Sequence, residues 1–99
     1  MSTRGYAEQV ASSIMNDADS VDEAVYFIYD SGDRKRNNGY SLDDLREFYG
    51  ELLGEIELRR IGLGENPNPS PAARENIAKL KAAEAAAQKR LLSIQEESS

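Results

Sequence analysis

The feature that most constrains this chain is the regular apolar pattern between residues 71 and 97. Apolar positions recur there at alternating steps of four and three residues, which is the spacing of a heptad seam along a helix. An α-helix rises about 1.5 Å per residue, so this helix is roughly 40 Å long. A globule built from so short a chain is narrower than that. The helix must therefore project from the fold or be covered along its length.

The composition of the seam is compatible with two kinds of packing partner for this helix. Alanines crowd its middle and Glu84 interrupts it, so the larger side chains near its ends provide most of the apolar contact area. Packing onto the preceding helix and coiled-coil contact with another chain both fit, because a heptad pattern does not identify its partner. The residues expected in this oligomer or helix-packing seam are Ile77, Leu80, Ala87, Leu91 and Ile94.

Two further helices are predicted in the first third of the chain. Apolar residues spaced four apart predict a helix over residues 5–16. Ser20 and Glu23 fit a capping box, which predicts a helix over 21–29. A strand is the alternative for this second segment, since it is rich in β-branched and aromatic residues, but the cap favours a helix. Residues 30–40 are predicted to form a polar loop.

The third helix in chain order is predicted over residues 41–60, beginning at a serine cap, Ser41. Gly50 and Gly54 lie inside it, and their spacing places both on one face. Each glycine costs about 1 kcal/mol relative to alanine in an exposed helix interior. We expect either that another helix approaches this face closely or that the two glycines are merely tolerated.

These elements predict an all-α fold, a small bundle of four helices whose C-terminal helix is long and heptad-patterned. Gly62 and Gly64 are expected to end the third helix. The chain then divides into a compact three-helix unit over 1–61, a linker rich in proline, asparagine and glycine over 62–70, and the long helix over 71–97.

Composition narrows the classes of function. The chain has 99 residues, a net charge of −6, no cysteine and no histidine. The acidic balance disfavours nonspecific binding to nucleic acid, and the missing side chains disfavour a zinc site and thiolate chemistry. No apolar run approaches a membrane span, and the first ten residues contain no apolar signal segment. We expect a cytoplasmic protein without a metal or cofactor.

The segment 30–40 lies between predicted helices and invites comparison with a calcium-binding EF-hand loop. If Gly39 takes the place of the obligatory turn glycine, Arg34 and Arg36 fall at the first two ligand positions and Leu45 at the acidic one. Arginine cannot ligate calcium, so the comparison fails.

The same segment contains the one cationic run of the chain, Arg34, Lys35 and Arg36. These three residues are a candidate phosphate contact for nucleic acid. Asp30 and Asp33 lie beside them, so a solvated, charge-balanced loop is the simpler interpretation. A DNA-binding helix-turn-helix motif fits poorly. The helix over 21–29 would have to enter the major groove of DNA, but its only charged residues are acidic.

Catalysis lacks support in the sequence. Histidine, the commonest general base, is missing, and no nucleophile–base arrangement is recognisable. The pair Asp43 and Asp44 is better explained as acidic residues in the first turn of a helix. We therefore expect a protein that is not an enzyme.

Carboxylates spaced four residues apart predict an acidic face on the helix over 41–60. We interpret this face as the binding site of a protein partner, and the chain as a regulator or inhibitor, in the manner of viral or mobile-element proteins that block host machinery. A structural subunit that assembles through the last helix is the alternative function, and nucleic-acid contact through residues 34–36 is a third. The predicted partner-binding residues are Asp44, Glu47, Glu51 and Glu55.

Overall fold

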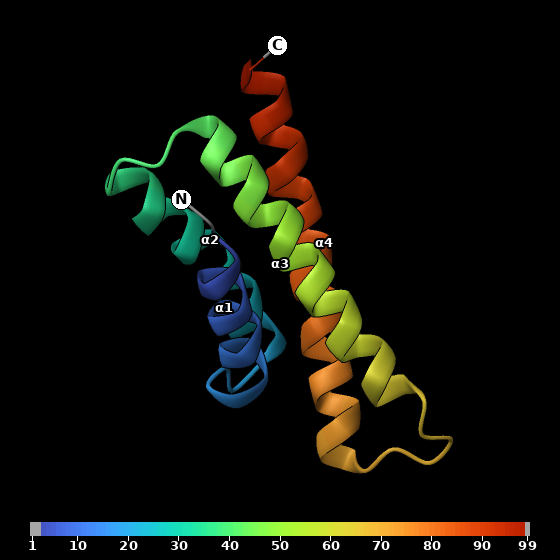
Figure 1. The fold of residues 1–99 in the computed structure, drawn as a ribbon. Coiled ribbons are helices and arrows are strands. Elements are labelled where there is room, and N and C mark those ends of the chain that lie inside the picture. Colours follow the sequence, from blue (N-terminus) through green and yellow to red (C-terminus); the bar gives the residue numbers. More distant parts are fainter. Residues whose placement is uncertain (1–2, 99) are drawn as a thin grey trace.

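Four helices and no strand make up the part of the chain that this computed structural model describes, residues 3–98, which confirms the predicted all-α bundle (Figure 1). Three of the helices begin directly after a serine whose hydroxyl accepts a backbone N–H three residues on. In chain order the helices are α1 (Arg4–Asn16), α2 (Val21–Asn37), α3 (Leu42–Gly64) and α4 (Pro71–Ser98).

The long helix α4 does not project freely. It runs antiparallel to α3 after a short connection, while α1 and α2 lie together against this pair (Figure 1). The molecule measures 44 × 23 × 21 Å, so its long axis is about the length of α4. The helix α4 contacts each of the other three helices. The apolar side of this long helix is therefore packed against helices of its own chain.

The third helix supplies the centre of the core. Phe48, Leu52 and Ile56 are fully buried, and Tyr49 is 2% exposed. The ring of Phe48 packs against those of Tyr6 and Tyr49, each at a centroid distance of 5.1 Å. The contact between Tyr6 and Phe48 joins α1 to α3, and the buried members of α4 complete the same cluster.

The predicted polar loop over residues 30–40 is wrong, because α2 continues to Asn37. Its polar residues find partners at helical spacing: Arg34 Nε lies 2.8 Å from a carboxylate oxygen of Asp30, one turn earlier. The cationic run then occupies the last turn of α2, where positive charge is favoured by the helix dipole. The turn itself comes at Gly39, whose φ of +99° suits glycine.

The predicted end of the third helix is also wrong, since α3 continues through Gly62 to Gly64. Tertiary contacts hold this end. Leu63 packs against the core, and Arg60 Nε lies 3.3 Å from Glu84 on α4. These contacts outweigh the unfavourable helix propensity of the two glycines.

A close approach between α2 and α3 depends on Gly32. This glycine is buried, and a Cβ built on it would collide with the Tyr49 hydroxyl, with the ring carbon Cζ only 2.7 Å away. That hydroxyl donates a hydrogen bond of 3.1 Å to the backbone oxygen of Ile28. Burial raises the pKa of Tyr49 to about 12, with nearby Arg90 opposing the shift.

We therefore predict opposite effects of alanine at two helical glycines. Gly32→Ala should destabilise the protein by about 1–2 kcal/mol, since overpacking outweighs the gain in helix propensity. Gly50→Ala meets no atom within 4 Å and should stabilise it by about 0.5–1 kcal/mol. Urea unfolding followed by circular dichroism measures both changes. If Gly32→Ala is as stable as Gly50→Ala, α2 and α3 do not approach as closely as described.

Candidate functional site

The predicted acidic face divides into carboxylates with structural partners and carboxylates without. Asp44 completes the capping box of α3, accepting from the Ser41 N–H at 3.0 Å. Glu55 pairs with Arg59 at 2.6 Å, and its side chain is only 15% exposed. Glu51 is half-buried and accepts from the Thr3 hydroxyl at 3.2 Å. Of the four predicted residues, Glu47 alone is exposed on α3 and has no hydrogen bond or ion pair within residues 3–98.

Beside Glu47, α3 exposes a strip that the charge pattern alone did not reveal. Leu58 is 67% exposed and Ile61 is 47% exposed. Gly50 and Gly54 have open space where their Cβ atoms would be, so no other helix of this chain covers them. Steps of three and four residues put all these positions on one side of α3. We call this side the open face of α3: Glu47, Gly50, Gly54, Glu57, Leu58 and Ile61.

A shallow pocket adjoins the open face. It has a volume of about 430 Å³ and is lined by α3 residues and by Arg4 at the start of α1. Two of the predicted acidic residues, Glu51 and Glu55, lie at its wall, next to Glu57 and Leu58. The structure thus brings the acidic residues and the exposed apolar side chain of Leu58 to the same place.

The seam of α4 faces the interior of the chain. Leu80 is fully buried, and Ala87 and Ile94 are 0% and 5% exposed, while Ile77 and Leu91 are half-buried. The alanine-rich middle provides close packing, since Ala83 and Ala86 are buried as well. In this conformation Leu80, Ala87 and Ile94 belong to the core of the chain, and Leu91 packs against it.

The cationic run is held by contacts within the chain. The Lys35 ammonium lies 4.2 Å from the centre of the Tyr6 ring and 5.3 Å from that of Tyr40, both cation–π contacts. Arg36 Nη1 donates to the Tyr40 backbone oxygen at 3.0 Å. Arg34 pairs with Asp30, as described above. These contacts give each of the three predicted phosphate-binding side chains a structural role.

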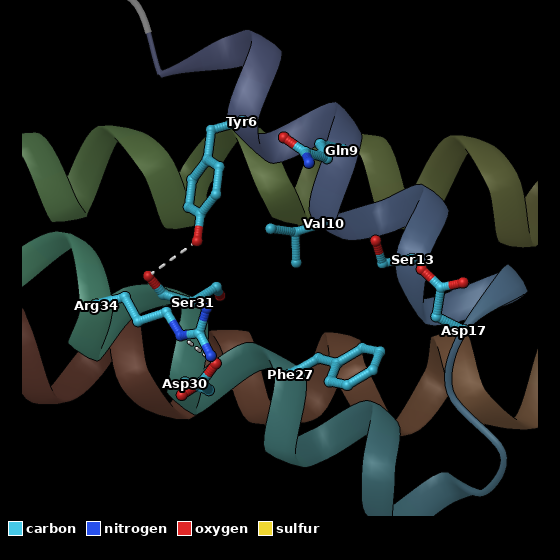
Figure 2. Close-up of a pocket in the computed structure, with 9 residues that line it drawn as sticks. All are labelled: Tyr6, Gln9, Val10, Ser13, Asp17, Phe27, Asp30, Ser31 and Arg34. Atoms are coloured by element: carbon cyan, nitrogen blue, oxygen red, sulfur yellow. Dashed lines mark hydrogen bonds and ion pairs between the residues drawn. The ribbon is translucent and has the colours of Figure 1, made fainter.

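A groove between α1 and α2 forms another pocket, of about 300 Å³ (Figure 2). Val10 and Phe27 form apolar walls, and the Tyr6 hydroxyl points toward the Ser31 backbone oxygen at 3.4 Å. Burial raises the pKa of Tyr6, and the charge of Arg34 works in the opposite direction. The Asp30–Arg34 ion pair closes one end of the groove, so these two charges already satisfy each other.

Residues 3–98 contain no cluster of three or more acidic side chains placed to hold a metal ion. None of the helices described in this range combines the length and the apolar character that a membrane crossing requires. No family model, curated protein or solved structure matches this chain.

The capping box predicts a pH dependence of stability. The hydrogen bond from the Ser41 backbone lowers the pKa of Asp44 from its ordinary value. Such a group stabilises the fold at pH values above its unfolded pKa, and this stabilisation is lost as the pH falls through its folded pKa. Asp44→Asn should therefore reduce stability at pH 7 and have a smaller effect at pH 2. Thermal unfolding at the two pH values tests this, and an equal effect at both would contradict the role of the carboxylate charge.

Proposed function

We propose that this protein is a non-enzymatic interaction module that regulates or inhibits a partner protein by binding a basic amphipathic helix on the open face of α3. The observation that carries the proposal is that Glu47, Glu57, Leu58 and Ile61 share one exposed side of α3 with two uncovered glycines.

The glycines make this side of α3 suitable for close contact with a helix. Without side chains at Gly50 and Gly54, a partner helix can approach the backbone of α3 and pack against Leu58 and Ile61 on the same face. Complete burial of such a side chain from an exposed state contributes roughly 1.5–3 kcal/mol. Leu58 is 67% and Ile61 47% exposed, so partner binding gains about those fractions of that value.

The carboxylates select the partner more than they strengthen the contact. An exposed ion pair contributes only about 0.2–1 kcal/mol, which is less than the burial of one leucine. Charge complementarity nevertheless speeds association and disfavours wrong partners. Lysine or arginine residues flanking the apolar face of a partner helix would meet Glu47 and Glu57.

The same charges argue against a second copy of this chain as the occupant. Two open faces packed in parallel place Glu47 opposite Glu47. An antiparallel pairing centred between the two glycines places Glu47 opposite Glu57. Both arrangements bring like charges together, so a basic partner fits this face better than a copy does.

The proposal predicts the effect of reversing Glu47 and Glu57, the two carboxylates of the open face, which have no hydrogen bond or ion pair within residues 3–98. Glu47→Lys combined with Glu57→Lys should remove a partner captured by the wild-type protein from lysate of its native host, measured by quantitative mass spectrometry. The matched control is Asp17→Lys with Asp19→Lys, which changes the net charge equally at exposed sites in the turn between α1 and α2, away from the open face. Cross-linking of the wild-type complex should place a basic helix of the partner against Leu58.

Four outcomes would contradict the proposal. If capture survives the Glu47 and Glu57 reversals, the open face is not the binding site. If capture is lost equally in the control variant, the loss is explained by the change in net charge. Recovery of the protein alone would favour the structural assembly subunit instead. Loss of every partner after nuclease treatment would favour nucleic-acid contact through residues 34–36.

A further inference from the structure

A third pocket lies at a different site, between the C-terminal halves of α2 and α4 and the beginning of α3. Its volume is about 180 Å³. Its lining combines Leu45, Tyr49 and Ile94 with charged and hydroxyl-bearing residues of α2 and α4. We call it the α2–α4 pocket.

Arg90 lines this pocket, and only one of the two nitrogens on one edge of its guanidinium group, Nη2, has a partner within residues 3–98. The guanidinium carbon lies 4.6 Å from the centre of the Tyr29 ring, a cation–π contact. Nη2 lies 3.4 Å from a carboxylate oxygen of Asp33, which is a long ion pair. Nε is buried and has no hydrogen-bond partner within residues 3–98. Nε and Nη2 together form a two-pronged donor suited to two oxygens of one anion.

Two more donors line the same pocket. Arg36 comes one turn after Asp33 on α2, and Ser93 comes one turn after Arg90 on α4. Arginine has five N–H donors, and the contact of Arg36 with Tyr40 uses one of its two terminal nitrogens. The acids on the wall are Asp33 and Glu97, and Asp33 satisfies Arg90 at one prong only.

We propose that the α2–α4 pocket binds a small oxyanion, a phosphate or a carboxylate, held by Arg90 and Arg36 with the Ser93 hydroxyl as a further donor. A buried arginine nitrogen without an acceptor calls for one, and an ion or ordered water is the usual explanation. A water molecule occupies roughly 30 Å³ in the liquid, so the pocket has room for a tetrahedral anion and several waters. Asp33 competes with the anion for Nη2.

The test is a titration of the full-length protein with inorganic phosphate, and separately with acetate, at constant ionic strength set by sodium chloride. Backbone amide signals of residues 33–36 and 90–93 should shift and saturate in nuclear magnetic resonance spectra. Phosphate alone saturating these shifts identifies a tetrahedral anion, and acetate doing so as well identifies the wider oxyanion class.

Two variants and a matched control make the test specific. Arg36→Gln should weaken binding at least about fivefold, since it removes a charged donor. Asp33→Asn should strengthen binding, because it removes the competing carboxylate and keeps the side-chain size. Arg34→Gln removes the same charge from the same helical turn but lines the groove of Figure 2, and should leave the affinity unchanged. Circular dichroism confirms that the variants fold.

The inference is overturned if neither anion gives saturable shifts in the wild-type protein. It is also overturned if Arg36→Gln and Arg34→Gln weaken binding equally, since that describes attraction to general positive charge. Weaker binding by Asp33→Asn would show that the carboxylate supports the site, which contradicts the proposed competition.

Discussion

The close packing of α4 along α3 is the constraint on which the rest of this small fold depends. Small side chains in the middle of α4, among them Ala83 and Ala87, are buried, so the two helix backbones can approach each other. Leu80 and Ile94 add apolar contact on either side of them. The resulting pair is long enough to provide a surface for α1 and α2, which have few residues in contact with each other and depend on this surface for burial (Figure 1).

Local sequence signals predicted the four helices. The two wrong helix ends lie where contacts with residues distant in the sequence determine how far a helix continues. Serine caps and apolar spacing identified all four helices, since both depend on neighbours in sequence. The end of α2 could not be found this way. Residues 30–37 look like a loop by composition, but the buried Gly32 meets Tyr49 from another helix. At the end of α3 the ion pair of Arg60 with Glu84 plays a similar part.

The candidate site was only partly predictable for the same reason. The carboxylates of α3 are visible in the sequence, but the partners of Asp44, Glu51 and Glu55 are revealed by the folded chain. The spacing of Gly50 and Gly54 was the one available signal for an uncovered helix side. The exposure of Leu58 and the pairing of Arg90 with Asp33 depend on how the helices pack, so no pattern of neighbouring residues predicts them.

The contact between Gly32 and Tyr49 also limits how this sequence can drift. The hydroxyl of Tyr49 is the atom closest to a methyl group at position 32, so replacement of that tyrosine by phenylalanine relieves part of the conflict and leaves Cζ at 2.7 Å. The hydroxyl, however, donates a hydrogen bond to the Ile28 carbonyl oxygen, and phenylalanine would lose that bond. Positions 32 and 49 should therefore covary among descendants of this chain, each accepting a change more readily once the other has changed.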